Sequence, residues 1–105
     1  MQVLFDRGTP APLRKFLTAH VVSTAYELGW SKLKNGELLE AAESTFDVLV
    51  TADKNHRYEQ NLAGRRLAIL VLPVTSWPRL QKYIDEIVST VDSLELGSYV
   101  ELKLD

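Results

Sequence analysis

The chain has 105 residues, a formal net charge of −2 at pH 7 and no cysteine, and 46% of its residues are hydrophobic. This length and composition predict one globular domain with a single core, and the lack of cysteine excludes disulfides, thiolate zinc sites and cysteine nucleophiles. The slightly acidic total argues against a general nucleic-acid binder but allows a local basic patch. No apolar run reaches the roughly 18 residues of a membrane span, and no basic segment leads into an apolar one at the amino terminus, so we expect a cytoplasmic protein with no membrane association.

The amino-terminal segment predicts a strand followed by a helix. Residues 2–5 form a short apolar run, typical of a buried strand, which ends at Asp6. Thr9 followed by Pro10 is the pattern of an N-cap with proline at the first helical position. The apolar residues over 13–17 have helical spacing and predict the helix itself.

A second strand and a second helix follow. The β-branched run over 20–24 predicts the strand, residues 25–29 a short helical turn, and residues 30–34 a loop. Asn35 stands where an N-cap is expected, at the start of a helix over 36–44.

The second half of the chain alternates in the same way. We expect a strand over 46–51, a polar helix over 54–62, a strand over 67–72 that is covered on both faces, and a long helix over 76–91. The last segment, 99–104, alternates apolar and polar residues like an edge strand with one solvated face.

Two aspartates directly follow predicted strands. Asp6 follows the first strand and Asp53 follows the third. Strands that alternate with helices predict a parallel sheet with helices on both faces, and the carboxyl ends of parallel strands share the edge where such sheets bind ligands. Two carboxylates that converge there offer a site for a hard divalent cation, and so for hydrolysis of a phosphodiester.

Several segments match one known family. They are Leu4-Phe5-Asp6 with Thr9-Pro10-Ala11-Pro12-Leu13, His20-Val21-Val22 with Glu27-Leu28-Gly29, Gly36-Glu37-Leu38-Leu39-Glu40-Ala41-Ala42, and Val48-Leu49-Val50-Thr51-Ala52-Asp53-Lys54. These segments resemble the small PIN-like nuclease family, whose members are often toxin components of toxin–antitoxin pairs. The resemblance covers nearly the whole chain, and the strand that closes on Thr-x-Asp-Lys is its most specific part.

The resemblance implies a fold, an activity and partners. The fold would be a three-layer α/β/α, Rossmann-like domain over residues 1–105, with a mostly parallel sheet of about five strands and an edge strand for which an antiparallel direction is also allowed. The activity would be that of a Mg²⁺- or Mn²⁺-dependent endoribonuclease, with Asp6, Asp53 and Glu37 as catalytic metal ligands and Asn55 as an outer ligand through water. A cognate antitoxin protein would hold the domain inactive, and members of the family often form homodimers.

Two positions depart from the family pattern. Asn35 stands where the family commonly has an aspartate at the start of the second helix, and Asn55 where it often has a second aspartate after the Thr-x-Asp motif. Each asparagine keeps an oxygen ligand but lacks the negative charge, which weakens metal binding. Glu37 can supply charge from the same turn of helix.

Cationic residues flank the predicted acidic site. Lys54, Arg57 and Lys34 are the candidates for holding the phosphates of a nucleic-acid strand. Further cations occur nearby in the sequence: Lys32, His56, Arg65 and Arg66. A solvated face, balanced by Glu59 and nearby acids, is the competing interpretation.

Each candidate ligand also has an ordinary structural explanation. Asp6 can serve as a turn residue before the next helix, and Asp53 as the N-cap of the helix over 54–62. Glu37 is favoured in a first helical turn by the helix dipole, with or without a metal. Asn35 is interpreted as a cap rather than a ligand.

Other polar and aromatic residues are assigned by their context. Thr51 and Ser76 have hydroxyls that could orient a ligand carboxylate. His20 has no partner at metal-ligand spacing and is interpreted as structural. Trp30 and Trp77 are interpreted as packing residues.

Two further functions remain open. A binding module of the same fold, with a weakened metal site, would act through protein or RNA contacts and is favoured by Asn35 and Asn55. A phosphoacceptor receiver domain also carries aspartates after its first and third strands. However, Arg7 follows Asp6 where receivers have a second acid, and no residue after Gly97 matches their lysine.

Overall fold

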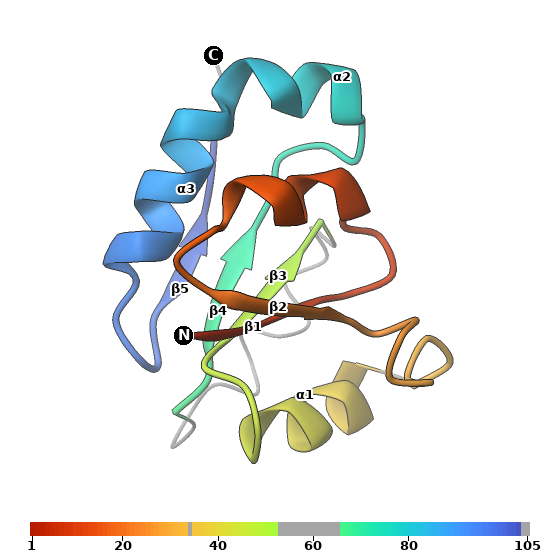
Figure 1. The fold of residues 1–105 in the computed structure, drawn as a ribbon. Coiled ribbons are helices and arrows are strands. Elements are labelled where there is room, and N and C mark those ends of the chain that lie inside the picture. Colours follow the sequence, from red (N-terminus) through yellow and green to blue (C-terminus); the bar gives the residue numbers. More distant parts are fainter. Residues whose placement is uncertain (34, 53–65, 104–105) are drawn as a thin grey trace.

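Parallel strands form the centre of the fold. The computed structural model describes residues 1–33, 35–52 and 66–103, and this part of the chain contains one five-stranded sheet with helices on both faces (Figure 1). The strands are β1 (Gln2–Phe5), β2 (Val21–Thr24), β3 (Val48–Thr51), β4 (Ala68–Val71) and β5 (Tyr99–Glu101). The helices are α1 (Asn35–Glu43), α2 (Trp77–Leu80) and α3 (Ile84–Ser93), with 3-10 helices η1 (Ala11–Phe16) and η3 (Gln81–Tyr83). The predicted α/β class is therefore confirmed.

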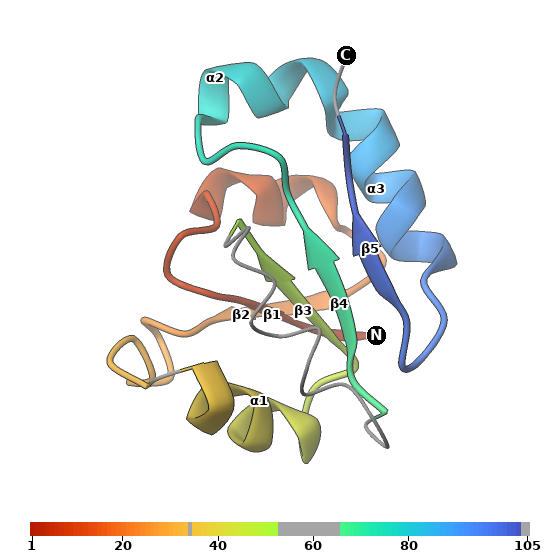
Figure 2. The same cartoon turned by 180° about the vertical axis from the view of Figure 1, so that it is seen from behind.

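The strands lie in the order β2-β1-β3-β4-β5, and all neighbouring pairs are parallel. Val3 is level with Val22 of β2 and with Val48 of β3, so β1 and β2 begin together and β3 begins one residue later. β5 lies at one edge beside β4, as Figure 2 shows. Its edge position agrees with the prediction, and its direction is parallel, so the antiparallel alternative does not apply.

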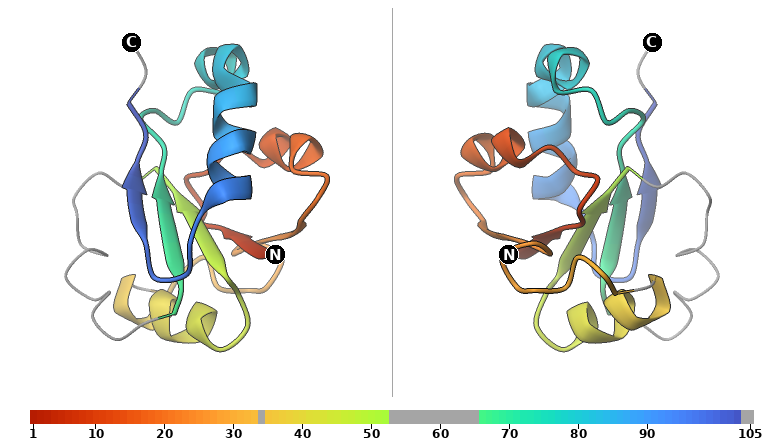
Figure 3. Two further views of the ribbon diagram at one scale, coloured as in Figure 1. Left: turned by 90° about the vertical axis from the view of Figure 1, so that its left-hand side faces the viewer. Right: turned by 90° about the vertical axis from the view of Figure 1, so that its right-hand side faces the viewer.

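Helices cover both faces because the central strands are apolar on both sides. Val48, Leu49 and Val50 of β3 are fully buried, and successive side chains of a strand point to opposite faces. One face packs against η1, α2 and α3, and the other packs against α1 (Figure 3). Each face carries a hydrophobic cluster. Outside the sheet, the cluster under η1, α2 and α3 includes Leu13, Leu17, Leu80, Ile87 and Val91, and the cluster under α1 includes Leu38, Leu39 and Ala42.

The long helix predicted over 76–91 is divided into two helices. The 3-10 segment η3 separates α2 from α3, and Tyr83 has φ −124° and ψ 21°, outside the α-helical region. The two helices point in different directions (Figure 1). Leu80 before the bend and Ile87 after it are both fully buried in the same cluster.

The helix predicted over 13–17 forms as the short 3-10 helix η1. Its hydrogen bonds span three residues, from the N–H of Leu13 to Pro10 (3.2 Å) and from the N–H of Leu17 to Arg14 (3.2 Å). The helix predicted over 54–62 lies outside the described residues. Among the helices of the described ranges, none has the length and apolar content to span a bilayer.

The second edge of the sheet is β2, and its pairing with β1 determines which backbone groups face outward. Ala25, just after β2, donates its N–H to Phe5 of β1 (2.8 Å). Alternate residues of a strand turn their backbone groups to opposite sides. The backbone groups of Val22 and Thr24 therefore point away from β1, toward the outer edge.

An ion pair covers this outer edge. Arg14 of η1 donates to the carbonyl oxygen of Val22 (3.0 Å), and Glu27 accepts from the N–H of Thr24 (2.9 Å). Arg14 and Glu27 also pair with each other through both terminal guanidinium nitrogens, Nη1 and Nη2. Side chains that occupy the polar groups of an edge strand prevent it from pairing with another chain.

The same contacts predict an acid-dependent contribution to stability. The Arg14 guanidinium and the Thr24 N–H, which donate to Glu27, lower the pKa of that carboxyl from 4.5 to about 2. Because the pKa is lower in the folded state, the stabilisation is complete above about pH 4.5 and is lost as the pH falls toward 2. Glu27→Gln should therefore show a shallower decline of the unfolding temperature over this range, measured by circular dichroism.

The matched control is Glu40→Gln, which changes an exposed glutamate of α1. This variant should decline as steeply with acid as the unmodified protein. Parallel curves for Glu27→Gln and the unmodified protein would show that the Arg14–Glu27 pair does not stabilise the fold.

Candidate functional site

The strand order places a ligand-binding position between β1 and β3. In sheets of the order 2-1-3-4-5, the topological switch point lies between these two strands, outside their carboxyl ends. Phe5 pairs with Val50 in the register, and the N–H of Asp6 donates to the carbonyl oxygen of Val50 (3.1 Å). Asp6 therefore lies beside Thr51, the last residue of β3.

Hydroxyl and backbone N–H groups donate to the carboxylate of Asp6. The hydroxyl of Thr51 donates to its Oδ2, and the N–H of Gly8 donates to its Oδ1 (3.1 Å). The hydroxyl of Thr9 lies 2.9 Å from Oδ1 and 2.8 Å from the carbonyl oxygen of Val50, and its single proton serves one of them at a time. Thr51 is fully buried and Asp6 is partly buried, so these contacts fix the orientation of the carboxylate at the strand end.

Asp6 is interpreted from the sequence both as a metal ligand and as a turn residue, and this geometry is compatible with both. The bond from Gly8 to the Asp6 side chain is the turn-forming contact expected of a structural aspartate. Thr51 orients the same carboxylate through its hydroxyl, as predicted. Ser76 has the other hydroxyl predicted to orient a ligand carboxylate, and it lies after β4 at the start of α2.

The prediction that Thr9 caps the following helix was wrong. Pro10 occupies the N-cap position of η1, and no side chain caps that helix. The hydroxyl of Thr9 faces Asp6 and Val50 instead. An aspartate followed two residues later by glycine and three residues later by threonine is a local signal for such a turn, and the N-cap pattern of Thr9-Pro10 obscured it.

Glu37 lies in the first turn of α1, and its side chain is exposed. The start of α1 lies toward the side of the molecule at which β1 and β2 end (Figures 1 and 2). Leu38 and Leu39, the next two residues, are buried against the sheet. The fold thus brings Glu37 toward the carboxyl edge of the sheet, the edge at which Asp6 lies.

The remaining predicted site residues lie outside the described part of the chain. They are Asp53, Lys54, Asn55, Arg57 and Lys34, together with His56 and Arg65. Asn35 is the first residue of α1. The second described range ends at Ala52, directly before Asp53, so the predicted pairing of Asp6 with Asp53 stays a prediction.

Arg66 does not belong to the predicted phosphate-binding group. It precedes β4, at the amino edge of the sheet, and donates to the Asp47 carboxylate (2.7 Å). The pKa of Asp47 is lowered, first by the N–H of Gln2 that donates to it and then by Arg66. Glu43 accepts from the backbone N–H groups of Arg66 (2.7 Å) and Leu67 (3.0 Å). For this cation the structural interpretation is correct, with Asp47 as the balancing acid.

His20 has the structural role predicted for it. Its Nε2 lies 2.6 Å from the Asp92 carboxylate of α3, and its Nδ1 lies 3.2 Å from the terminal amino group of Met1. The two tryptophans pack as predicted: Trp30 meets Phe46 edge-to-face, and Trp77 lies 6.1 Å from another aromatic ring, that of Phe16.

The donor set at the switch point suits a hard cation. The side chains of Asp6, Thr9 and Thr51 present oxygen atoms there, and Mg²⁺ and Mn²⁺ prefer carboxylate and other oxygen ligands. Within the described ranges, no three His, Asp or Glu residues are grouped closely enough to hold a metal ion. The predicted cluster includes Asp53, so this observation does not test it.

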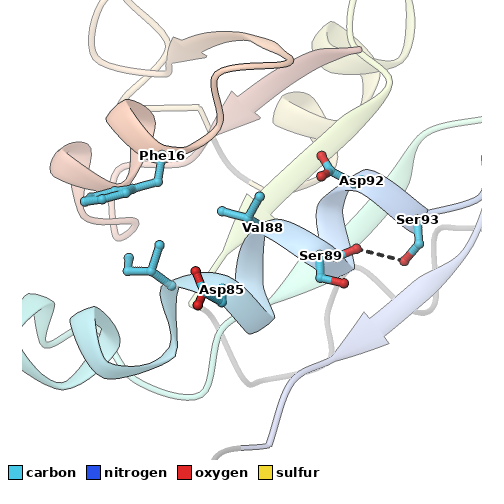
Figure 4. Close-up of a pocket in the computed structure, with 7 residues that line it drawn as sticks. Phe16, Asp85, Val88, Ser89, Asp92 and Ser93 are labelled. Carbon is cyan, nitrogen blue, oxygen red and sulfur yellow. Dashed lines mark hydrogen bonds between the residues drawn. The ribbon is translucent and has the colours of Figure 1, made fainter.

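A separate groove lies between η1 and α3. It has a volume of about 500 Å³ and is lined by Phe16 and by side chains of α3 from Ile84 to Ser93 (Figure 4). Asp85 and Asp92 are its charged groups, and Asp92 is bonded to His20. None of the predicted site residues lines this groove.

The chain matches no protein-family model, no curated protein and no solved structure. The assignment of the site therefore rests on the residues and their geometry.

The contact between Thr51 and Asp6 predicts an energetic coupling. Thr51→Val removes a buried donor to a carboxylate and should lower the free energy of unfolding by about 1–3 kcal/mol. In a double-mutant cycle with Asp6→Ala, the combined loss should be smaller than the sum of the single losses, because both variants remove the same bond. Urea unfolding of the four proteins measures this difference.

Thr75→Val is the control, because Thr75 is exposed in the loop after β4. It should change the free energy of unfolding by less than about 0.5 kcal/mol. Losses that add within about 0.3 kcal/mol would mean that Thr51 and Asp6 act independently.

Proposed function

We propose that this protein is a divalent-metal-dependent nuclease that hydrolyses RNA at the carboxyl ends of β1 and β3. The observation that carries the proposal is the carboxylate of Asp6, which is oriented by Thr51 and Gly8 at the switch point of a parallel sheet. The resemblance of the sequence to PIN-like nucleases supports the same activity. An oriented carboxylate at this position is suited to metal binding because it loses little freedom when it accepts a ligand.

Oxygen ligands at this edge would hold Mg²⁺ or Mn²⁺. Asp6 would bind the ion directly, Asp53 and Glu37 would complete the acidic cluster, and Asn55 would act through a water. A bound ion of this kind lowers the pKa of a water and neutralises the charge that develops on the phosphate.

The chain's own residues have two further tasks in this proposal. Thr51 keeps Asp6 in one orientation through its buried hydroxyl, so the carboxylate is held in place for metal binding. Lys54, Arg57 and Lys34 would bind the phosphates of the RNA and align the scissile bond. No covalent intermediate with the protein is required.

The resemblance extends the proposal to the setting of the enzyme. A partner protein encoded as its antitoxin would bind the nuclease and keep it inactive. The nuclease would act in the cytoplasm, and two copies would form a homodimer.

Metal binding and cleavage test the proposal together. Calorimetric titration should show saturable binding of Mn²⁺ to the unmodified protein, and Asp6→Asn and Asp53→Asn should each abolish it. Cleavage of a labelled single-stranded RNA should depend on the added metal and fall by more than about 100-fold in both variants, because each loses a direct ligand.

Asp85→Asn is the matched control, since it removes a carboxylate from the groove beside α3. It should leave both metal binding and cleavage unchanged. A folded protein that binds no Mn²⁺, with or without the oligonucleotide, would contradict the proposal.

A second function is favoured by the hydrogen bonds of Asp6. The carboxylate accepts bonds from Thr51 and Gly8, and the Thr9 hydroxyl lies within reach, so part of its capacity as an acceptor is already used by the protein. Together with the lost charges at Asn35 and Asn55, this geometry supports a binding module that contacts RNA or protein but does not cleave.

Restoring both charges distinguishes the two functions. If the natural site is too weak, Asn35→Asp combined with Asn55→Asp should raise the affinity for Mn²⁺ by about tenfold or more, because added carboxylates strengthen hard-cation sites. The double variant would then also cleave RNA that the unmodified protein only binds. An unchanged affinity in calorimetry would count against the binding module.

A further inference from the structure

Tyr26 is exposed to an unusual degree for an aromatic residue. Its side chain is 81% exposed, a larger fraction than that of any other large apolar side chain in the described ranges. Tyr26 lies in the turn that follows β2, at the same edge of the sheet as Asp6. The only polar atom of its side chain is the hydroxyl, so most of the exposed surface is ring.

Backbone hydrogen bonds hold the turn that presents Tyr26. The N–H of Gly29 donates to the carbonyl oxygen of Tyr26 (3.1 Å), and Gly29 has φ +74°, which closes the turn. The N–H of Trp30 donates to the carbonyl oxygen of Ala25 (2.7 Å), so a second backbone hydrogen bond spans the turn that contains Tyr26. The ring is therefore carried by an ordered piece of backbone.

The register places this turn beside the candidate site. β1 and β2 are neighbours, and Ala25 donates its N–H to Phe5, the residue before Asp6. Tyr26 directly follows Ala25, and Asp6 directly follows Phe5. Tyr26 and Asp6 therefore lie at the ends of adjacent strands.

Two exposed cations share this edge with Tyr26. Arg7 follows Asp6, and Lys32 lies in the loop after β2. Glu27, the acid next to Tyr26, is paired with Arg14 of η1, so its charge is compensated. Proteins bind single-stranded nucleic acid by stacking bases on exposed aromatic rings and by contacting phosphates with nearby cations.

We propose that Tyr26 is a stacking platform for a base of single-stranded RNA, and that Arg7 and Lys32 contact the neighbouring phosphates. The proposal rests on the proposed function, since it assigns the RNA path that leads to Asp6. The ligand is a single strand, because a base inside a duplex does not expose its face to a protein ring.

Binding is measured separately from cleavage. The probe is a fluorescent oligouridylate of about twelve nucleotides, titrated in Mg²⁺ with protein carrying Asp6→Asn so that the RNA stays intact. Adding Tyr26→Ala should weaken binding by about 5- to 150-fold, the usual range for loss of one stacked base. Tyr26→Phe keeps the ring and should bind within about twofold of the parent.

Salt dependence separates stacking from charge. Arg7→Gln should reduce the slope of log affinity against log salt by about 0.7, the value for one phosphate contact on a single strand. Tyr26→Ala should lower the affinity without changing this slope. Ultraviolet cross-linking to 5-bromouridine RNA should join the RNA to the peptide that contains Tyr26.

Leu96→Ala is the matched control, because Leu96 is 55% exposed before β5, at the amino edge of the sheet. It should leave the affinity unchanged. Equal affinity of Tyr26→Ala and its parent would overturn the assignment of Tyr26 even if the unmodified protein cleaves RNA. Tyr26-dependent binding without metal-dependent cleavage would support the stacking platform and contradict the nuclease. Absence of RNA binding would overturn both.

Discussion

The burial of the central strands on both faces is the constraint on which the rest of the structure depends. All four residues of β3 and of β4 are buried. Strands of this kind leave no place for polar side chains along their length, so helices must cover both faces and polar groups collect at the strand ends. Asp6 and Thr51 meet at the carboxyl ends, and Asp47 and Arg66 meet at the amino ends.

The two ends of the strands differ in their chemistry. At the amino edge, Asp47 pairs with Arg66, and Glu43 accepts two backbone N–H groups, so the charges serve to hold loops to the sheet. At the carboxyl edge, Thr51 and Gly8 donate to Asp6 and orient its carboxylate. The carboxyl ends of the strands are also the position at which parallel sheets of this order bind ligands.

The turn after β2 combines protection of the sheet with presentation of a side chain. Glu27 accepts from the N–H of Thr24, and its own N–H donates to the Thr24 hydroxyl (3.1 Å), so the two residues cap each other. The ion pair with Arg14 then closes the outer edge of β2. Because these bonds fasten the turn, Tyr26 stays at the surface beside the end of β1, although its ring is largely uncovered.

The sequence by itself determined the local features: the apolar runs predicted the strands, helical spacing predicted α1 and α3, and the position of Asp6 after a strand was correct. These features follow from the spacing of apolar residues along the sequence, because this spacing reflects which side chains of a helix or strand are buried. Only the tertiary structure decided the strand order, the bend at Tyr83, and the side-chain partners. Thr9 meets Val50 across 41 positions of sequence, and His20 meets Asp92 across 72. Such contacts depend on how distant segments pack, and no local pattern encodes that packing.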